Sequence, residues 1–201
     1  MKSTMHALLA LVALAPALPA ADETHIAYEV VGQVLNPSPQ QSLQYGYLNR
    51  VRGLDRIVSQ DGTVSEANAL FTFYNDTMTE RVINNGPMRL IDRTGVGTIY
   101  FNDGGGASFS NPDSFRIGKA IQSCNLRHQV IIDTSTGYFT TIFEMTATSA
   151  TTFQIDGKTY RLGKPGQVYR LVVSGKLAAQ APPAAYIAGL ANGPGADLID
   201  Q

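Results

Sequence analysis

The sequence holds one cysteine, no tryptophan and few charged residues, and each shortage excludes a class of protein. With Cys124 alone, no internal disulfide framework is available, and we expect this side chain to be a small buried apolar group. Lysine and arginine total 15 against 16 aspartate and glutamate residues, so no strongly basic face exists for a nucleic acid. The charged share of 15% is low for a protein with long surface helices.

The first twenty residues have the composition of a secretory signal peptide. Lys2 precedes an apolar run over Ala7–Leu18, and small residues favour cleavage after Ala20. The run of about a dozen residues is too short to span a bilayer, which takes roughly 20. We therefore expect residues 1–20 to be removed and the protein, without a membrane span, to be secreted or to reside in the lumen of the secretory pathway.

Short apolar runs with alternating side chains recur after this leader. In the run Ala69–Asn75, Phe71 and Phe73 share one face of an extended chain, and Thr72 and Tyr74 share the other. No strongly amphipathic helix pattern separates these runs. Glycine and proline residues are frequent, 19 and 10 in number, and the clearest turn signals are Asn84–Pro87, Arg93–Gly95, Thr134–Gly137 and Asp156–Gly157. The pattern predicts an all-β fold.

The number and character of the runs favour a closed sheet. Several strands carry bulky residues on both faces, whereas a sandwich with one wet face alternates more cleanly between apolar and polar residues. Closure also removes exposed strand edges. We predict a single antiparallel β-barrel of about eight strands over residues 24–175, with a two-layer sandwich as the alternative. Residues 176–201 are rich in alanine, proline and glycine and predict a flexible tail.

Three short stretches resemble the allene oxide cyclase and dirigent β-barrel superfamily and its microbial relatives. They are Phe71–Tyr74, Gly95–Tyr100 and Thr134–Phe139. The resemblance implies an eight-stranded barrel that assembles into homo-oligomers. It also implies a lumen that binds an unsaturated hydrophobic molecule and guides ring closure or radical coupling without a bound cofactor.

Motifs for metals, nucleotides and hydrolysis are missing from the sequence. His25 and His128 stand alone, with no second histidine at metal-ligand spacing and no acidic triplet beside either one. The glycines of Asp103–Gly106 precede no helix and so predict a plain loop rather than a phosphate cradle. No serine elbow is present, and no base pairs plausibly with Cys124. We expect neither a metal nor a cofactor.

The candidate catalytic residues are therefore ionisable groups on strands. Glu144 lies within the most apolar run of the second half, where a carboxylate either points to water or is desolvated in a pocket and serves as an acid or base. Asp92 is either a buried charge that needs a partner or part of an Asp-Arg-Thr-Gly turn. His128 can titrate near neutral pH or fill a structural position.

Tyrosines at strand positions provide phenol groups that can donate a hydrogen bond to a ligand oxygen. Tyr100 joins the candidate catalytic set, and Tyr74, Tyr138 and Tyr169 are candidate substrate-binding residues, with core or rim packing as the alternative for each. Asn75 begins an Asn-Asp-Thr triplet and is a candidate glycosylation site in a eukaryotic secretory pathway.

Taken together with the resemblance, these residues lead to two hypotheses for function. The first is a cofactor-free cyclase or stereochemical guide that folds a hydrophobic intermediate, such as a polyketide or terpenoid, near its attack geometry. The second is a lipocalin-like secreted carrier of a small hydrophobic ligand. A structural sandwich without a cavity is a third possibility, and it is distinguished from the other two by a filled interior.

Overall fold

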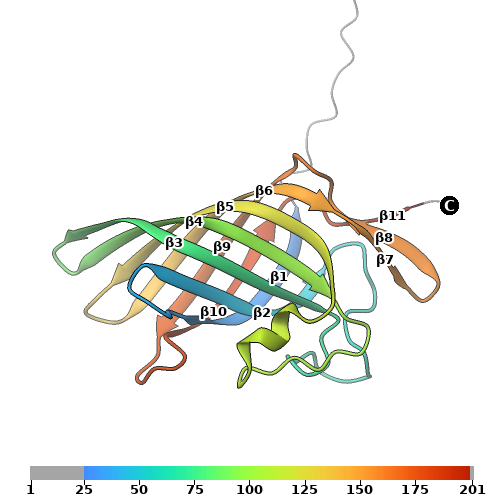
Figure 1. The fold of residues 1–201 in the computed structure, drawn as a ribbon, viewed down its shortest axis with the longest axis horizontal. Coiled ribbons are helices and arrows are strands. Elements are labelled where there is room, and N and C mark those ends of the chain that lie inside the picture. Colours follow the sequence, from blue (N-terminus) through green and yellow to red (C-terminus); the bar gives the residue numbers. More distant parts are fainter. Residues whose placement is uncertain (1–24, 200–201) are drawn as a thin grey trace, which may run out of the picture.

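The structure is a closed eight-stranded antiparallel barrel, with three short strands forming a second sheet at one end (Figure 1). It is a computed structural model that describes residues 25–199, so the expected signal peptide lies outside the described residues. The barrel prediction is confirmed, and the sandwich alternative is wrong. The strand order around the barrel is β1-β10-β9-β6-β5-β4-β3-β2.

Most connections between the elements are short, and the two longest, residues 52–70 and 102–118, follow β2 and β4. The barrel strands are β1 (Ile26–Leu35), β2 (Gln41–Val51), β3 (Phe71–Asn85), β4 (Met88–Phe101), β5 (Lys119–Asp133), β6 (Tyr138–Ala150), β9 (Val168–Leu177) and β10 (Ala185–Asn192). The second sheet contains β7 (Thr152–Ile155), β8 (Lys158–Leu162) and β11 (Ala196–Leu198). One 3-10 helix, η1 (Pro112–Arg116), lies between β4 and β5.

Alternation of side chains decides which face of each strand forms the core. In β6, Phe139, Phe143 and Met145 are buried, whereas Thr140 and Glu144 between them are exposed. The same period of two places Phe71 and Phe73 of β3 on one face, as the sequence predicts, and the structure shows that this face lies inside the barrel. Cys124 on β5 is free and buried, which confirms its expected packing role.

The two ends of the barrel differ. At one end the sheet β7-β8-β11 packs against the barrel, and Phe153 lies with its ring centroid 5.4 Å from that of Phe71. At the opposite end, on the left of Figure 1, the β3–β4 and β5–β6 hairpins extend outward. The segment around η1 covers the outer face of β2, where Tyr45 packs against Phe109 and Phe115.

Residues 176–199 are not a flexible tail, and that prediction is wrong. β10 closes the barrel by pairing with β1 on one side and β9 on the other. Its inner face carries small or branched residues, Ala185, Ile187 and Ala191, so the composition resembles that of a linker while the alternation is that of a strand.

The hairpin predicted about Arg93–Gly95 is also absent, because β4 runs without a break from Met88 to Phe101. Gly95 lies against the backbone of Asp76 and Thr77 on β3, which occupies the space a side chain at this position would need. A glycine in the sequence here indicates close packing and not a turn. The predicted turns at Asn84–Pro87, Thr134–Gly137 and Asp156–Gly157 are confirmed.

A truncated chain tests the role of β10. A protein that ends at Gln180 lacks β10 and exposes the hydrogen-bonding edges of β1 and β9 that pair with it. We expect this protein to show no cooperative thermal unfolding transition in circular dichroism. A protein that ends at Asn192 retains all eight barrel strands and should unfold cooperatively. A normal transition from the shorter chain would contradict the closure described here.

Substitution of Gly175 by alanine tests the packing on β9. Gly175 is paired with Phe139, and a Cβ atom added here would overlap the Phe139 ring. We expect Gly175→Ala to lower the free energy of unfolding by about 1–3 kcal/mol, as overpacking does. In urea denaturation, Gly175→Ala should cost less in a Phe139→Leu background than in the wild type, whereas equal costs in the two backgrounds would exclude the clash.

Candidate functional site

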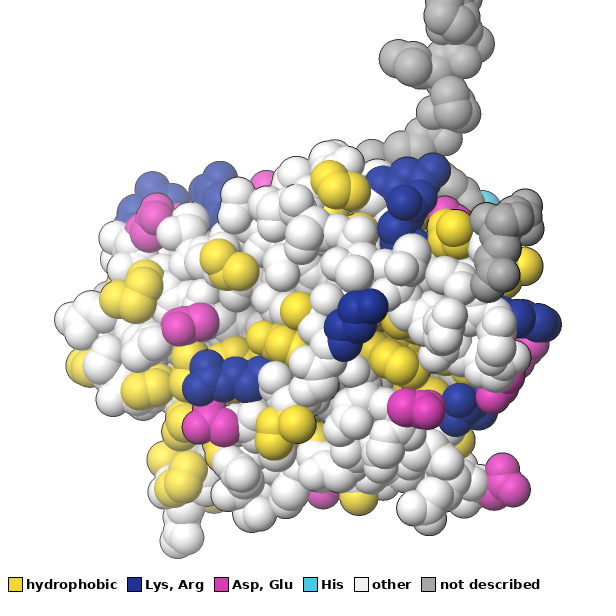
Figure 2. All heavy atoms as spheres, turned by 45° about the vertical axis from the view of Figure 1, so that its right-hand side comes forward, with side chains coloured by type: hydrophobic (Ala, Val, Ile, Leu, Met, Phe, Trp, Pro, Cys, Tyr) yellow, Lys and Arg dark blue, Asp and Glu magenta, His cyan; other side chains and the backbone are white. Residues whose placement is uncertain are grey.

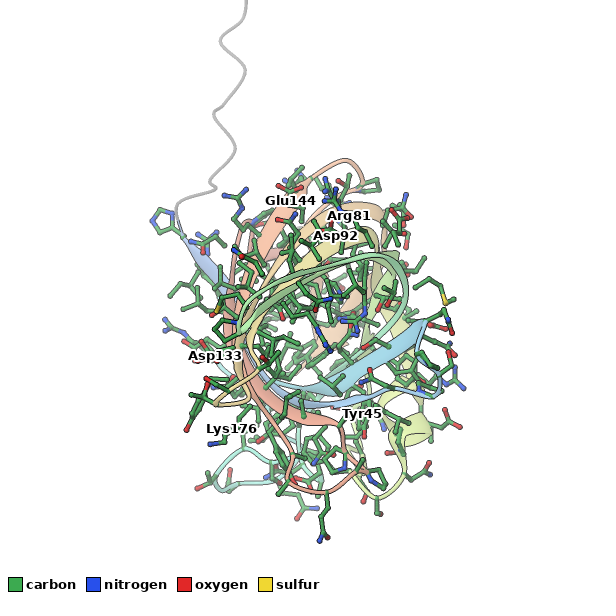
Figure 3. The ribbon with its side chains drawn as sticks, turned by 90° about the vertical axis from the view of Figure 1, so that its left-hand side faces the viewer. Tyr45, Arg81, Asp92, Asp133, Glu144 and Lys176 are labelled. Carbon is green, nitrogen blue, oxygen red and sulfur yellow. The ribbon has the colours of Figure 1, made fainter. Side chains whose placement is uncertain are left out.

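A cavity of about 220 Å³ occupies the half of the barrel that opens between the long hairpins. Its walls come from β1, β2, β4, β5, β6, β9 and β10. Most of the lining is hydrophobic: Val34, Ile91, Val130, Ile132, Phe139, Phe143, Val173, Leu177, Ala184, Ala185 and Ile187. The polar lining residues are Asn36, Ser42, Gln44, Arg89, Arg93, His128 and Thr141. Figure 3 views the molecule from this end.

The other half of the barrel is filled with side chains. Tyr28 and Tyr169 are buried there, with ring centroids 5.9 Å apart, and a space of only about 20 Å³ remains. Phe73 lies over Gly32 and Gly46, whose missing side chains make room for its ring. The cavity therefore ends inside the barrel and has one open end.

His128 is the most unusual polar residue of the cavity. Its side chain projects inward from β5, is 1% exposed, and has no hydrogen-bond partner at either Nδ1 or Nε2. The Phe143 ring meets the imidazole edge-on, with centroids 4.6 Å apart. Burial, together with the nearby Arg93 charge, lowers the pKa of His128 from 6.5 to about 3. The imidazole is therefore neutral at pH 7, with one donor and one acceptor that no described residue satisfies.

Arg93 lies directly opposite His128 in the β4–β5 pairing. Its Nε atom donates a hydrogen bond to Thr79 Oγ1 at 3.1 Å, and burial lowers the pKa of its guanidinium. Within residues 25–199, no carboxylate lies within ion-pair distance of Arg93. The cavity therefore holds a positive charge that no carboxylate of the described residues balances.

Gln44 adds a third polar group from β2. Its Nε2 atom donates to Ser42 Oγ at 2.9 Å and to Thr77 Oγ1 at 3.2 Å, which fixes the amide. Its Oε1 atom is buried and has no hydrogen-bond partner among the described residues. Buried polar groups without partners are rare and costly in folded proteins, so their presence around one cavity indicates a place for a ligand.

Glu144 does not line this cavity. It lies on the outer face of β6, where its Oε1 accepts a hydrogen bond from Arg170 Nη2 at 3.2 Å (Figure 3). More than half of each side chain is exposed, so the solvated alternative holds and the desolvated pocket position is wrong.

Of the two interpretations of Asp92, a buried charge or a turn residue, the structure supports the buried charge. Like Glu144, Asp92 lies outside the lumen. Although only 6% exposed, it is on the outer face of β4 beside Arg81 (Figure 3). Arg81 forms an ion pair with Asp92, and Gln129 Nε2 donates to Asp92 Oδ1 at 3.0 Å. These hydrogen bonds, that of Gln129 first, lower the pKa of the Asp92 carboxyl. The carboxylate is therefore satisfied by Arg81 and Gln129, and it links β4 to the strands on either side.

The four candidate tyrosines also lie apart from the cavity. Tyr74 and Tyr100 are half-buried on the outer face, and Arg116 lies over the Tyr74 ring at 5.0 Å. Tyr138 is 57% exposed beside Lys176. Tyr169 points inward but belongs to the filled half, where Gln122 Nε2 donates to its hydroxyl at 3.0 Å. The structure thus favours packing roles for these phenols.

Asn75 faces the interior of the barrel and is 6% exposed. It borders the small residual space of the filled half, next to Gly97. The folded barrel therefore does not present this amide at its surface, where a glycan would be attached.

Of the residues selected from the sequence, only His128 lines the cavity. Arg93 and Gln44, the polar groups that join it, were not selected. Arg93 was expected in a turn, because Gly95 follows it closely. The alternation of Arg89, Ile91 and Arg93 through one uninterrupted strand was the available signal.

Comparisons with known proteins do not assign the chain to a family. No family model, no curated protein and no solved structure matched it. The resemblance to allene oxide cyclase and dirigent barrels stays a prediction. Residues 25–199 contain no group of three His, Cys, Asp or Glu side chains placed to hold a metal ion. No helix in this part of the chain is long and apolar enough to cross a membrane.

The surface adds no sign of a polyanion partner on the face shown in Figure 2. Basic and acidic side chains are scattered there with hydrophobic side chains between them, and no basic region gathers. The cavity is therefore the feature of the described structure on which a function is best based.

The pH dependence of stability tests the burial of His128. Its folded pKa lies below its unfolded value of 6.5, so its contribution to stability is complete above pH 6.5 and is lost as pH falls toward 3. Between pH 7.5 and pH 5, the loss should be about 2 kcal/mol. Urea denaturation at both pH values should show this loss for the wild type and a smaller one for His128→Gln. Parallel losses in the two proteins would mean that His128 is not buried as described.

Proposed function

We propose that this protein binds one small, mostly apolar molecule in the open half of its barrel. One observation carries the proposal. Side chains fill one half of the barrel and leave a cavity with hydrophobic walls in the other half. Its volume of about 220 Å³ is that of about seven water molecules at 30 Å³ each. A ligand of about seven to ten non-hydrogen atoms suits this volume. Binding also provides hydrogen-bond partners for His128 and Gln44.

The positions of the carboxylates favour a carrier over a cyclase. Ring closure by general acid and base needs two groups within reach of one substrate. Glu144 and Asp92 face outward and are engaged with Arg170 and Arg81, so neither can act on a molecule in the lumen. The lipocalin-like carrier is therefore the better supported hypothesis.

Ring closure is the second candidate, and one observation favours it. The neutral imidazole of His128 lines the cavity without a hydrogen-bond partner, and Arg93 lies opposite on the next strand. A pKa of about 3 makes this imidazole a weak base at pH 7, so the step requires a substrate that offsets the Arg93 charge and raises that pKa. The imidazole then removes a proton, and the guanidinium stabilises the resulting oxyanion. His128 would then be the catalytic residue, in agreement with the sequence-based hypothesis, and Arg93 would replace the proposed carboxylate.

Titration with 1-octanol tests the binding function without requiring the natural ligand. Methyl signals of Ile132 and Ile187, which line the cavity, should shift in carbon-detected NMR spectra, whereas those of the buried Ile155 near the opposite end should not. We expect Ala185→Phe to weaken binding at least about tenfold, because its ring would enter the cavity.

Ala188→Phe is the matched control, since it adds the same ring to the exposed face of the same strand. It should bind 1-octanol like the wild type. Shifts at Ile155 equal to those at Ile187, or no shifts at all, would exclude the lumen as the binding site.

A further inference from the structure

The cavity walls are divided by chemistry. Every lining residue from β1, β9 and β10 is hydrophobic: Val34, Val173, Leu177, Ala185 and Ile187. The arginines and the histidine come from the neighbouring strands β4 and β5. A ligand held here therefore meets a charged wall on one side and an apolar wall on the other, which matches a molecule with a polar head and a hydrophobic body.

The charges of the lining have one sign. Arg93 and Arg89 line the cavity, and no aspartate or glutamate does so. The Nε atom of Arg89 donates to Asn84 Oδ1 at 2.9 Å, and that of Arg93 donates to Thr79, so both arginines have neutral partners. A cation in a partly desolvated site without an anion is unfavourable, and an anionic ligand removes that penalty.

His128 provides the second contact. Residues directly opposite on antiparallel strands have Cβ atoms about 4.5–5.5 Å apart, so the side chains of Arg93 and His128 are neighbours on the cavity wall. The imidazole lines the cavity and both its nitrogens lack partners, so a carboxylate next to the guanidinium would give one N–H the acceptor that it lacks. Two donors side by side match the two oxygens of a carboxylate.

Resting on the binding function above, we propose that the ligand is a small amphiphilic monocarboxylate, with its carboxylate held by Arg93 and His128. Its hydrocarbon part lies against the apolar wall of β1, β9 and β10. An amine is excluded by the two arginines, and an uncharged ligand leaves the guanidinium without an anion. Arg93 is then the residue that sets specificity.

Three probes of equal chain length test the head-group preference on the wild-type protein. We expect octanoate to bind at least about tenfold more tightly than 1-octanol, the scale of one hydrogen bond to a charged group, and octylamine to bind most weakly. The readout is the shift of the Ile132 and Ile187 methyl signals at pH 7.5. Equal affinity for octanoate and 1-octanol would overturn the carboxylate proposal and leave the binding function standing. Failure of all three probes would overturn both.

A charge-matched pair of variants tests the role of Arg93. Arg93→Gln should lower the affinity for octanoate at least about tenfold and so remove most of the preference for octanoate over 1-octanol. Arg127→Gln removes the same charge from the exposed face of β5 and should retain the preference. Preference retained in Arg93→Gln would overturn the assignment of Arg93. If this variant does not fold, the comparison of probes on the wild type still decides the head group.

Discussion

The pairing of β1 with β10 is the interaction on which the rest of the structure depends. These strands lie at opposite ends of the described chain, and their ladder converts an open eight-stranded sheet into a barrel. Closure alone gives the sheet an inside, so the burial of Phe143, Leu171 or His128 follows from it. Val34 and Ile187, from the two closing strands, also line the cavity, so fold and site share this constraint.

Within single strands, the sequence predicted the structure well. The alternation of side chains identified the residues of β3 that share a face, and asparagine and glycine residues located three hairpin turns. Both signals act over a few neighbours, where backbone geometry alone determines the outcome. The closed barrel was also predicted, because bulky residues on both faces are difficult to satisfy in a sandwich.

Features that depend on distant partners were predicted poorly. Small residues in β10 resembled a linker, because their neighbours across the barrel provide the bulk that they lack. Gly95 resembled part of a turn for a related reason, since the backbone of Asp76 and Thr77 on the adjacent strand lies against it. Glu144 seemed the best candidate in the most apolar strand, yet alternation says which residues share a face and not which face becomes the lumen. Arg93 was overlooked for the same reason.

Because one half of the barrel is filled, the cavity is a dead end that a molecule enters and leaves by a single opening. If a ligand binds as proposed, it and the water it displaces must pass through the same rim between the hairpins, in opposite directions. No second molecule can push the first out from behind, since Phe73, Tyr28 and Tyr169 block that route. Residence time is therefore governed by the rim, and changes there alter the speed of exchange without touching the interior that selects the guest.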